Sequence, residues 1–139
     1  MNLKKILVSG IAGGIVYFFL GYLFYGVLFA SAMESPVAGV NRHMDQMVWW
    51  SMILGSLLYG MLVAFAIGLA KTVKASTGIA IGSLLGLLVS ASFDFIMYAK
   101  TFLTSINNII YDIAISTVIT AIAGAIVALV GGLVSKEGE

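Results

Sequence analysis

Four long apolar runs make up most of the chain, and the short links between them and the two chain ends carry most of the charged residues. The runs span about residues 6–32, 47–70, 76–97 and 106–134. Each reaches the roughly 20 residues that a helix needs to cross a bilayer, and none shows the alternation of a membrane β-strand. Because the links are short, successive helices should be antiparallel neighbours. The pattern predicts a single all-α membrane domain over residues 1–139, an antiparallel four-helix transmembrane bundle.

The third and fourth runs each carry a small or acidic residue at every fourth position. The series are Gly78, Gly82, Gly86, Ser90 and Asp94 in the third run, and Asp112, Ser116, Thr120, Gly124, Ala128 and Gly132 in the fourth. An i, i+4 series forms a ridge along one helix face, and small residues let membrane helices approach closely. If the two helices are antiparallel, each residue of the first series lies opposite a residue of the second. Asp94 is then opposite Asp112, and every fourth residue pairs in turn up to Gly78 opposite Ala128. These two helices should form the tightest contact of the bundle.

The first two runs carry a less regular set of small residues. The four-residue spacing recurs in the first run at Gly10 and Gly14. Setting Gly21 of the first run opposite Gly55 of the second would also bring Tyr17 opposite Tyr59. This pairing would leave the face with Gly10 and Gly14 free for association with another helix.

Composition places the protein in a lipid bilayer. The chain is 61% hydrophobic and 9% charged, with a mean hydropathy of +1.11, which lies far outside the range of soluble domains. A net charge of +1 gives no electrostatic attraction to nucleic acid, and the absence of cysteine excludes disulfides and thiolate chemistry. With one histidine, no Gly-x-Ser-x-Gly segment and no phosphate-binding glycine loop, the sequence predicts no enzyme and no cofactor.

Basic residues are divided unevenly between the two sides of the predicted bundle. One side carries Lys4, Lys5, Lys71, Lys74 and Lys136, and the other carries Arg42 and Lys100. Lys and Arg in short loops are enriched on the cytoplasmic side of membrane proteins. Both termini should therefore be cytoplasmic, which places Asp94 and Asp112 near the outer side.

Asp94 and Asp112 are the residues that helix packing does not require. Intramembrane acids usually pair, line a cavity or exchange protons, because an ionised carboxylate near hydrocarbon is costly. Two carboxyls at one depth could share a proton or hold a cation. The alternative is structural, and the sequence favours it: both aspartates lie close to helix ends, where they could reach interfacial water, cap backbone groups, or pair with Lys100 or Arg42.

Two further groups of residues have weaker claims to a function. Glu34, His43 and Asp45 offer metal-ligating atoms in the first loop, but their spacing matches no zinc signature and such loop residues are usually solvated. The aromatic residues of the first hairpin could hold an apolar or cationic ligand against their ring faces, although such residues more often face lipid. They are Tyr17, Tyr22, Tyr25 and Tyr59, with Phe18, Phe19, Phe24 and Phe29.

The segment from Gly21 to Phe29 reads Gly-Tyr-Leu-Phe-Tyr-Gly-Val-Leu-Phe. It resembles the end of the first helix in the bacterial membrane family known as domain of unknown function 1761, where a Gly-x-x-Trp-Tyr-Gly-Pro-Leu-Phe-like segment is found. The residues that agree include Gly26, Leu28 and Phe29, and those that differ include Phe24 and Val27. Tyr111 to Ala114 is similar to the acidic start of that family's last helix. The resemblance implies a four-helix fold and a bacterial inner membrane, and it implies no activity.

Two classes of function are consistent with these features. The leading one is a non-enzymatic membrane protein that acts through helix packing and associates with itself or with a membrane protein partner, through a face such as that of Gly10 and Gly14. The alternative is a small oligomeric transporter or channel with an outward-facing acidic site at Asp94 and Asp112. Ionisable residues are almost absent from the middle and inner half of the predicted spans, which weighs against transport. Whether a substrate would be an ion or a small molecule stays open.

Overall fold

The computed structural model describes residues 2–136, and every regular element in that range is helical. The four long helices are α1 (Leu3–Gly21), α2 (Trp49–Leu69), α3 (Ala75–Lys100) and α4 (Ile106–Lys136). The two short elements are η1 (Tyr22–Leu28), a π-helical segment that continues α1, and η2 (Met44–Gln46), a 3-10 turn. Four segments are long and apolar enough to cross a membrane, so the prediction of four such helices is confirmed.

Local interactions set the limits of the first and last spans. The side chain of Asn2 accepts a hydrogen bond from the Lys5 backbone N–H at the start of α1 (3.4 Å). The first span ends at Leu28 rather than near residue 32, because Phe29 has left helical geometry with φ −118° and ψ 17°. The apolar residues that follow belong to a connection, which hydropathy alone cannot distinguish from a helix. At the start of α4, the Ser105 hydroxyl accepts a hydrogen bond from the Asn108 N–H (3.2 Å).

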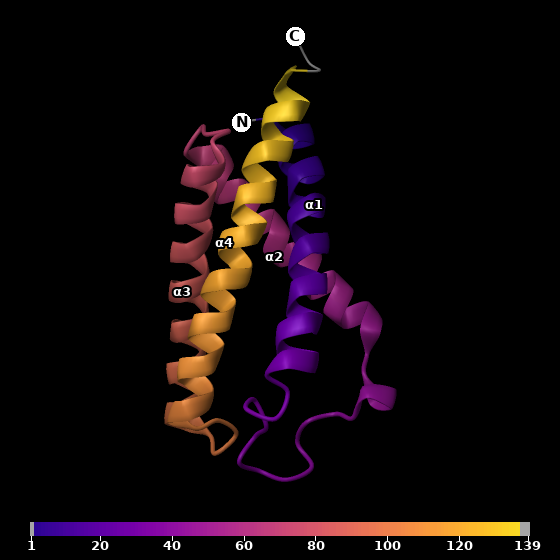
Figure 1. Ribbon diagram of the computed structural model, residues 1–139, viewed down its shortest axis with the longest axis vertical. Helices are drawn as coiled ribbons and strands as arrows, with labels where there is room; N and C mark the ends of the chain where they lie inside the picture. The colour runs from indigo at the N-terminus through magenta and orange to yellow at the C-terminus, as the bar shows by residue number, and fades with distance from the viewer. Residues whose placement is uncertain (1, 137–139) are drawn as a thin grey trace.

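Successive helices run in opposite directions, so both termini and the α2–α3 connection lie at one end of the bundle, here called the terminal end (Figure 1). The long connection between η1 and α2 and the short one between α3 and α4 lie at the other, the loop end. In Figure 1, α4 runs down the middle between α1 and α3, and α2 crosses behind them at a tilt. This central place agrees with α4 being the most buried of the four spans.

α3 and α4 approach so closely that backbone meets backbone. Along the interface Gly78 lies against Gly124, Gly82 against Thr120, and Gly86 against Ser116. A methyl group on Gly82 would collide with the Thr120 carbonyl oxygen, and one on Gly86 would lie 2.6 Å from the Ser116 carbonyl oxygen. The two ridges of small residues face each other as predicted, but these closest contacts are shifted by one four-residue step from the predicted pairs, which set Gly82 opposite Gly124 and Gly86 opposite Thr120. In lipid, where burial of apolar side chains gains little, this approach multiplies the dispersion contacts that hold helices together.

Hydroxyl groups in the α3–α4 interface are satisfied within their own helices. Ser90 donates to the Gly86 carbonyl (2.6 Å), and Thr120 donates to the Ser116 carbonyl (2.7 Å). An unsatisfied polar group at membrane depth is costly, so this bonding lets small hydroxylated residues occupy a buried interface.

α1 and α2 meet through a different glycine contact from the one predicted. A methyl group on Gly60 would collide with the backbone of Gly10 and Gly14, so these three glycines form the crossing point. A Cβ added to Gly21 or to Gly55 would have no atom within 4 Å, and their predicted pairing is therefore wrong. The accompanying prediction that Tyr17 lies opposite Tyr59 is confirmed, because their ring centroids are 4.7 Å apart. Because α2 is tilted, the two helices approach at one point and diverge on either side of it.

Ile109, Ile115 and Ile119 of α4 are buried toward the loop end. The cluster of buried apolar residues that pack on one another, here called the apolar core, lies in the half of the bundle nearer the terminal end. Its buried residues are Val63, Ala64 and Ile67 of α2 with Val127 and Ala128 of α4. Partly buried apolar residues of α1 and α3 pack around them. This half is closed by close-packed side chains, whereas the loop half contains the polar groups and the clefts described next.

Candidate functional site

Polar side chains from all four spans gather in the loop half of the bundle. The acids come from α3 and α4, and the phenols come from the first span and α2. The residues of this polar cluster are Tyr17, Tyr25, Tyr59, Ser90, Asp94, Asp112, Ser116 and Thr120. Hydrogen bonds within their own helices already account for the hydroxyls of Ser90 and Thr120. The acids and phenols are the groups whose roles need explanation.

The α3–α4 hairpin brings Asp94 and Asp112 side by side. Both side chains are partly buried, and their carboxyl groups lie close enough to interact directly. The Oδ2 atom of Asp94 is enclosed and has no hydrogen-bond partner among residues 2–136. An enclosed oxygen of an ionised carboxylate beside a second carboxylate is unfavourable, and a proton or a cation at this point would relieve it.

Two tyrosines of the α1–α2 hairpin face the acids. The rings of Tyr17 and Tyr59 lie 4.7 Å apart between centroids and are inclined by 38°. The Tyr59 hydroxyl is enclosed without a hydrogen-bond partner in the described part of the chain, although the hydroxyls of Ser116 and Thr120 lie nearby. Asp112 is near enough to act electrostatically on both phenols. The tyrosines therefore border the acids rather than facing only lipid.

A small open cleft of about 250 Å³ lies between the two hairpins at this level. Its lining residues are Tyr17, Tyr25, Tyr59, Val89, Ser90, Phe93, Asp112 and Ser116. The cleft thus combines aromatic walls with one carboxyl group and several hydroxyls. Such a mixture of apolar walls and a few polar groups is typical of small-molecule sites.

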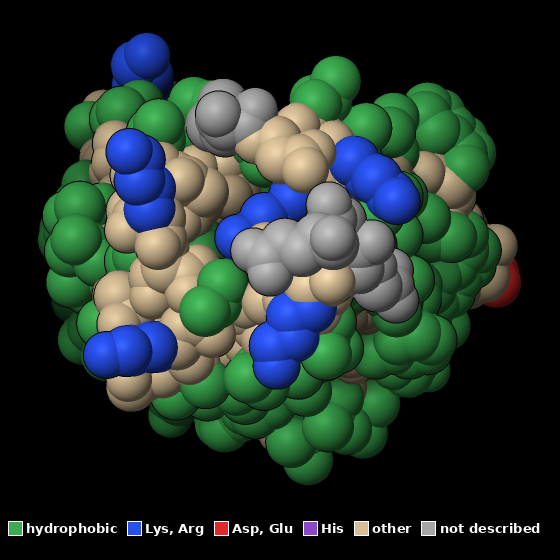
Figure 2. Space-filling view, turned by 90° about the horizontal axis from the view of Figure 1, so that it is seen from above, with side chains coloured by type: hydrophobic (Ala, Val, Ile, Leu, Met, Phe, Trp, Pro, Cys, Tyr) green, Lys and Arg blue, Asp and Glu red, His purple; other side chains and the backbone are tan. Residues whose placement is uncertain are grey.

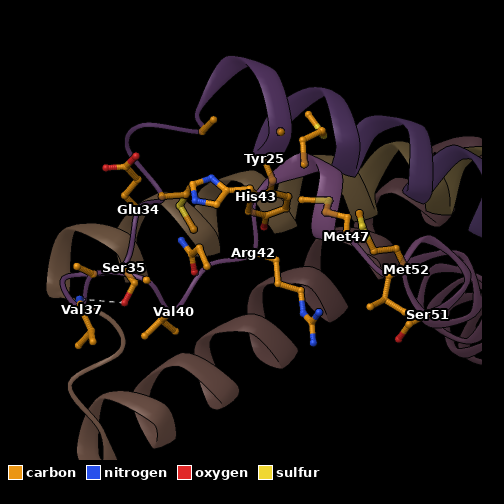
Figure 3. A pocket seen from close by; sticks show the side chains of 18 of the residues that line it. Tyr25, Glu34, Ser35, Val37, Val40, Arg42, His43, Met47, Ser51 and Met52 are labelled. Carbon is orange, nitrogen blue, oxygen red and sulfur yellow. Dashed lines mark hydrogen bonds between the residues drawn. The ribbon is translucent and has the colours of Figure 1, made fainter.

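A larger open cleft of about 1090 Å³ occupies the loop end, lined by residues of η1, the long connection and the start of α2. Both clefts are lined by Tyr25 and Asp112, and the Tyr25 hydroxyl donates a long hydrogen bond to the Asp112 backbone carbonyl (3.4 Å). Figure 3 shows Tyr25 among the side chains around the larger cleft. Arg42 also lines this cleft, but its guanidinium points away from Tyr25. The larger cleft therefore leads from the loop end to the junction with the smaller one.

The three loop residues considered as metal ligands do not form a cluster. Glu34 and His43 line the larger cleft, whereas Asp45 is exposed in η2. Within residues 2–136 no group of three His, Asp or Glu side chains is arranged to hold a metal ion. Arg42, a possible partner for the acids, donates instead to the Gln46 carbonyl (3.4 Å).

The long connection is tied to the α3–α4 hairpin by hydrogen bonds that the sequence did not reveal. The Ser35 hydroxyl donates to the Leu103 carbonyl (2.7 Å), and the Asn108 amide donates to the Glu34 carbonyl (2.9 Å). Both bonds join segments far apart in the chain, so no local spacing signals them. They hold one wall of the larger cleft in place.

That the tyrosines lie beside the acids was also not predicted from the sequence, although the spacing of residues in the first run indicates it. Gly10, Gly14, Tyr17, Gly21 and Tyr25 recur at intervals of three or four residues, which places them on one stripe of a helix. Because this stripe continues to Tyr25, it predicts that Tyr17 and Tyr25 lie on the same face of the first span as the glycines that pack against α2.

The terminal end is basic. Figure 2 shows lysine side chains gathered around this end of the molecule. The lysines belong to the first turn of α1, the α2–α3 connection and the last turn of α4: Lys4, Lys5, Lys71, Lys74 and Lys136. The side-chain carbons of Lys5 pack near Gly131, so its charge can reach beyond the helices while its stem covers apolar surface.

No protein-family model, curated protein or solved structure matches this chain. The resemblance to domain of unknown function 1761 stays a prediction from two short motifs. Function is therefore inferred from the polar cluster and the clefts.

Proposed function

We propose that the protein is a non-enzymatic, multi-pass transporter of the bacterial inner membrane that accepts a proton or a small cation at the carboxyl pair of Asp94 and Asp112. The observation that carries the proposal is the enclosed, unpartnered Oδ2 atom of Asp94 beside a second carboxyl group. Structural acids in membranes are normally paired with a base or bonded to backbone donors. A site that lacks such a partner is suited to a mobile positive charge.

Charge distribution gives the direction in which the site faces. The basic terminal end fits the cytoplasmic side, where Lys and Arg of short loops are enriched and anionic lipid attracts them. Both termini are then cytoplasmic, and the larger cleft opens outward. A proton or cation would reach the acids from the outside.

The arrangement of the hairpins supplies a means of moving the site. Each hairpin is held together internally by glycine contacts, and the polar cluster lies between the hairpins, with phenols on one and acids on the other. Rocking of one packed unit against the other is a common route to alternating access. In this protein such rocking would have to open the apolar core of the terminal half, because that half closes the inner side in the described conformation.

Self-association through Gly10 and Gly14 is not part of this proposal, because both glycines are buried against α2 within one chain. Assembly into a homo-oligomer, or with a membrane protein partner, through another face stays a prediction.

Transport is tested with purified protein in liposomes that contain a pH-sensitive dye and that carry imposed gradients of H⁺, Na⁺ or K⁺. We expect flux above that of empty liposomes for the native chain and a loss of at least about tenfold in the double variant Asp94→Asn/Asp112→Asn, because two neutral amides cannot accept a proton or neutralise a cation. Asp45→Asn, an exposed loop change, is the matched control and should leave flux unchanged. Background flux for all three ions and for a small alkylammonium ion, in both the native chain and the double variant, would remove the transporter proposal.

A further inference from the structure

We infer that the smaller cleft binds a small primary ammonium ion with an apolar tail. This inference rests on the proposed function, because it names the class of cation that the site between the hairpins accepts.

The walls of the cleft favour an organic cation over a bare metal ion. Three phenol rings, Phe93 and Val89 form most of the lining. Aromatic ring faces attract organic cations and also contact alkyl groups. Hard inorganic cations instead favour several carboxylate or carbonyl oxygens, and among the described lining residues one carboxyl group, that of Asp112, stands beside neutral hydroxyls.

The unpartnered polar atoms favour a primary amine over a quaternary one. Within residues 2–136 the enclosed Tyr59 hydroxyl has no hydrogen-bond partner, and the neighbouring Asp112 carboxyl lines the same cleft. Both oxygens can accept a hydrogen bond, and a protonated primary amine carries three N–H donors. A quaternary ammonium has no N–H, so it would leave these acceptors unsatisfied.

Size and access limit the ligand further. Drug-sized ligands occupy pockets of about 300–1,000 Å³. The cleft of about 250 Å³ is smaller than these and suits a tail of only a few carbons. The ligand would arrive through the larger cleft at the loop end and pass the junction at Tyr25 and Asp112.

Binding is measured by titration calorimetry of the purified full chain in detergent, at constant ionic strength, with n-butylammonium, tetramethylammonium, 1-butanol and K⁺. We expect saturable binding of n-butylammonium, and at least tenfold weaker binding of each of the other three. The neutral alcohol tests the need for charge, and tetramethylammonium tests the need for N–H donors. Equal affinity for n-butylammonium and tetramethylammonium would overturn the primary-ammonium class.

Variants locate the site and control for folding and for partitioning of the amine into detergent. Asp112→Asn should weaken n-butylammonium binding at least tenfold, and Asp112→Glu should restore part of it. Tyr59→Phe keeps the ring but lacks the hydroxyl, so it should reduce the preference for n-butylammonium over tetramethylammonium. The exposed change Asp45→Asn should alter neither value. Binding that survives Asp112→Asn in a variant with native circular dichroism would overturn the assignment of the site.

The flux assay separates this inference from the proposed function. Proton or cation flux that requires the two aspartates, without binding of n-butylammonium, would overturn the ligand class and leave the transporter proposal standing. If the native chain shows neither flux nor binding of n-butylammonium, both the transporter proposal and the ligand class are overturned.

Discussion

At the residue scale, two aspartates of one hairpin occupy different surroundings. Asp112 lines both clefts, and its backbone carbonyl accepts the hydrogen bond from Tyr25. Asp94 lies beside Asp112 with one enclosed carboxylate oxygen, and it is absent from the lining of either cleft. This difference predicts that Asp112 contacts the cation directly. Asp94 would attract the cation only through the negative charge that it adds next to Asp112.

Replacement of Asp94 by Asn should stabilise the protein when no cation is added. The change removes repulsion between neighbouring carboxylates and the cost of an enclosed, unpartnered charge. We expect a gain of about 1 kcal/mol in the free energy of unfolding at neutral pH, which is measured as a higher Tm in detergent. The surface change Asp45→Asn should stay within about 0.5 kcal/mol of the native chain. A lower Tm for Asp94→Asn would show that the carboxylate has a stabilising partner.

At the element scale, glycines with the same helical geometry have different consequences. Gly82 lies where α3 touches the α4 backbone, and Gly60 lies where α2 crosses α1. Gly55 lies on the same helix as Gly60, but a Cβ added to it would meet no other atom within 4 Å. Glycine therefore holds the hairpins together only where a side chain would separate two backbones.

Alanine substitutions at two of these glycines should have opposite effects. Gly82→Ala should destabilise the protein by about 1–3 kcal/mol, because its methyl group meets a backbone carbonyl that cannot move aside alone. Gly55→Ala should be neutral or stabilising by up to about 1 kcal/mol, because alanine is the better helix former and has open space here. Thermal unfolding followed by circular dichroism measures both. Equal effects of the two changes would contradict the contact between α3 and α4.

At the scale of the whole molecule, the two halves of the bundle differ in character. The terminal half has an apolar core and a basic rim (Figure 2), and the loop half has clefts, acids and phenols. The difference gives the protein a polarity across the membrane. The site is open toward the loop end and closed toward the terminal end. One state of an alternating-access transporter is expected to have this arrangement.

The proposed orientation can be tested by labelling with a membrane-impermeant maleimide, because the native chain has no cysteine. Asn41→Cys lies in the exposed part of the long connection, and Ser76→Cys lies exposed in the first turn of α3 near the terminal end. We expect labelling of Asn41→Cys in intact cells and of Ser76→Cys only after permeabilisation. The reverse pattern would place the clefts on the cytoplasmic side and contradict the outward-facing site.

The elements that followed from the sequence are those governed by local periodicity. Apolar runs of sufficient length predicted four spanning helices, and the four-residue spacing of small residues predicted which faces of α3 and α4 meet, although the closest contacts are shifted by four residues from the predicted pairs. The contact between α1 and α2 could not be predicted in the same way. It depends on the tilt of α2, which moves the crossing point from Gly55 to Gly60.

The candidate site could be predicted only in part. The matched register of two neighbouring helices was enough to expect Asp94 and Asp112 at one depth, but not the phenols opposite them, because the distance between the hairpins is set by packing around α4. The sequence by itself thus determined the number of spans, their apolar character and the pairing within the last hairpin, since each depends on residues close in the chain or evenly spaced along it. Only the tertiary structure decided that Tyr17, Tyr25 and Tyr59 border the acids and that a cleft separates the hairpins, because these features arise where helices distant in the sequence cross at an angle.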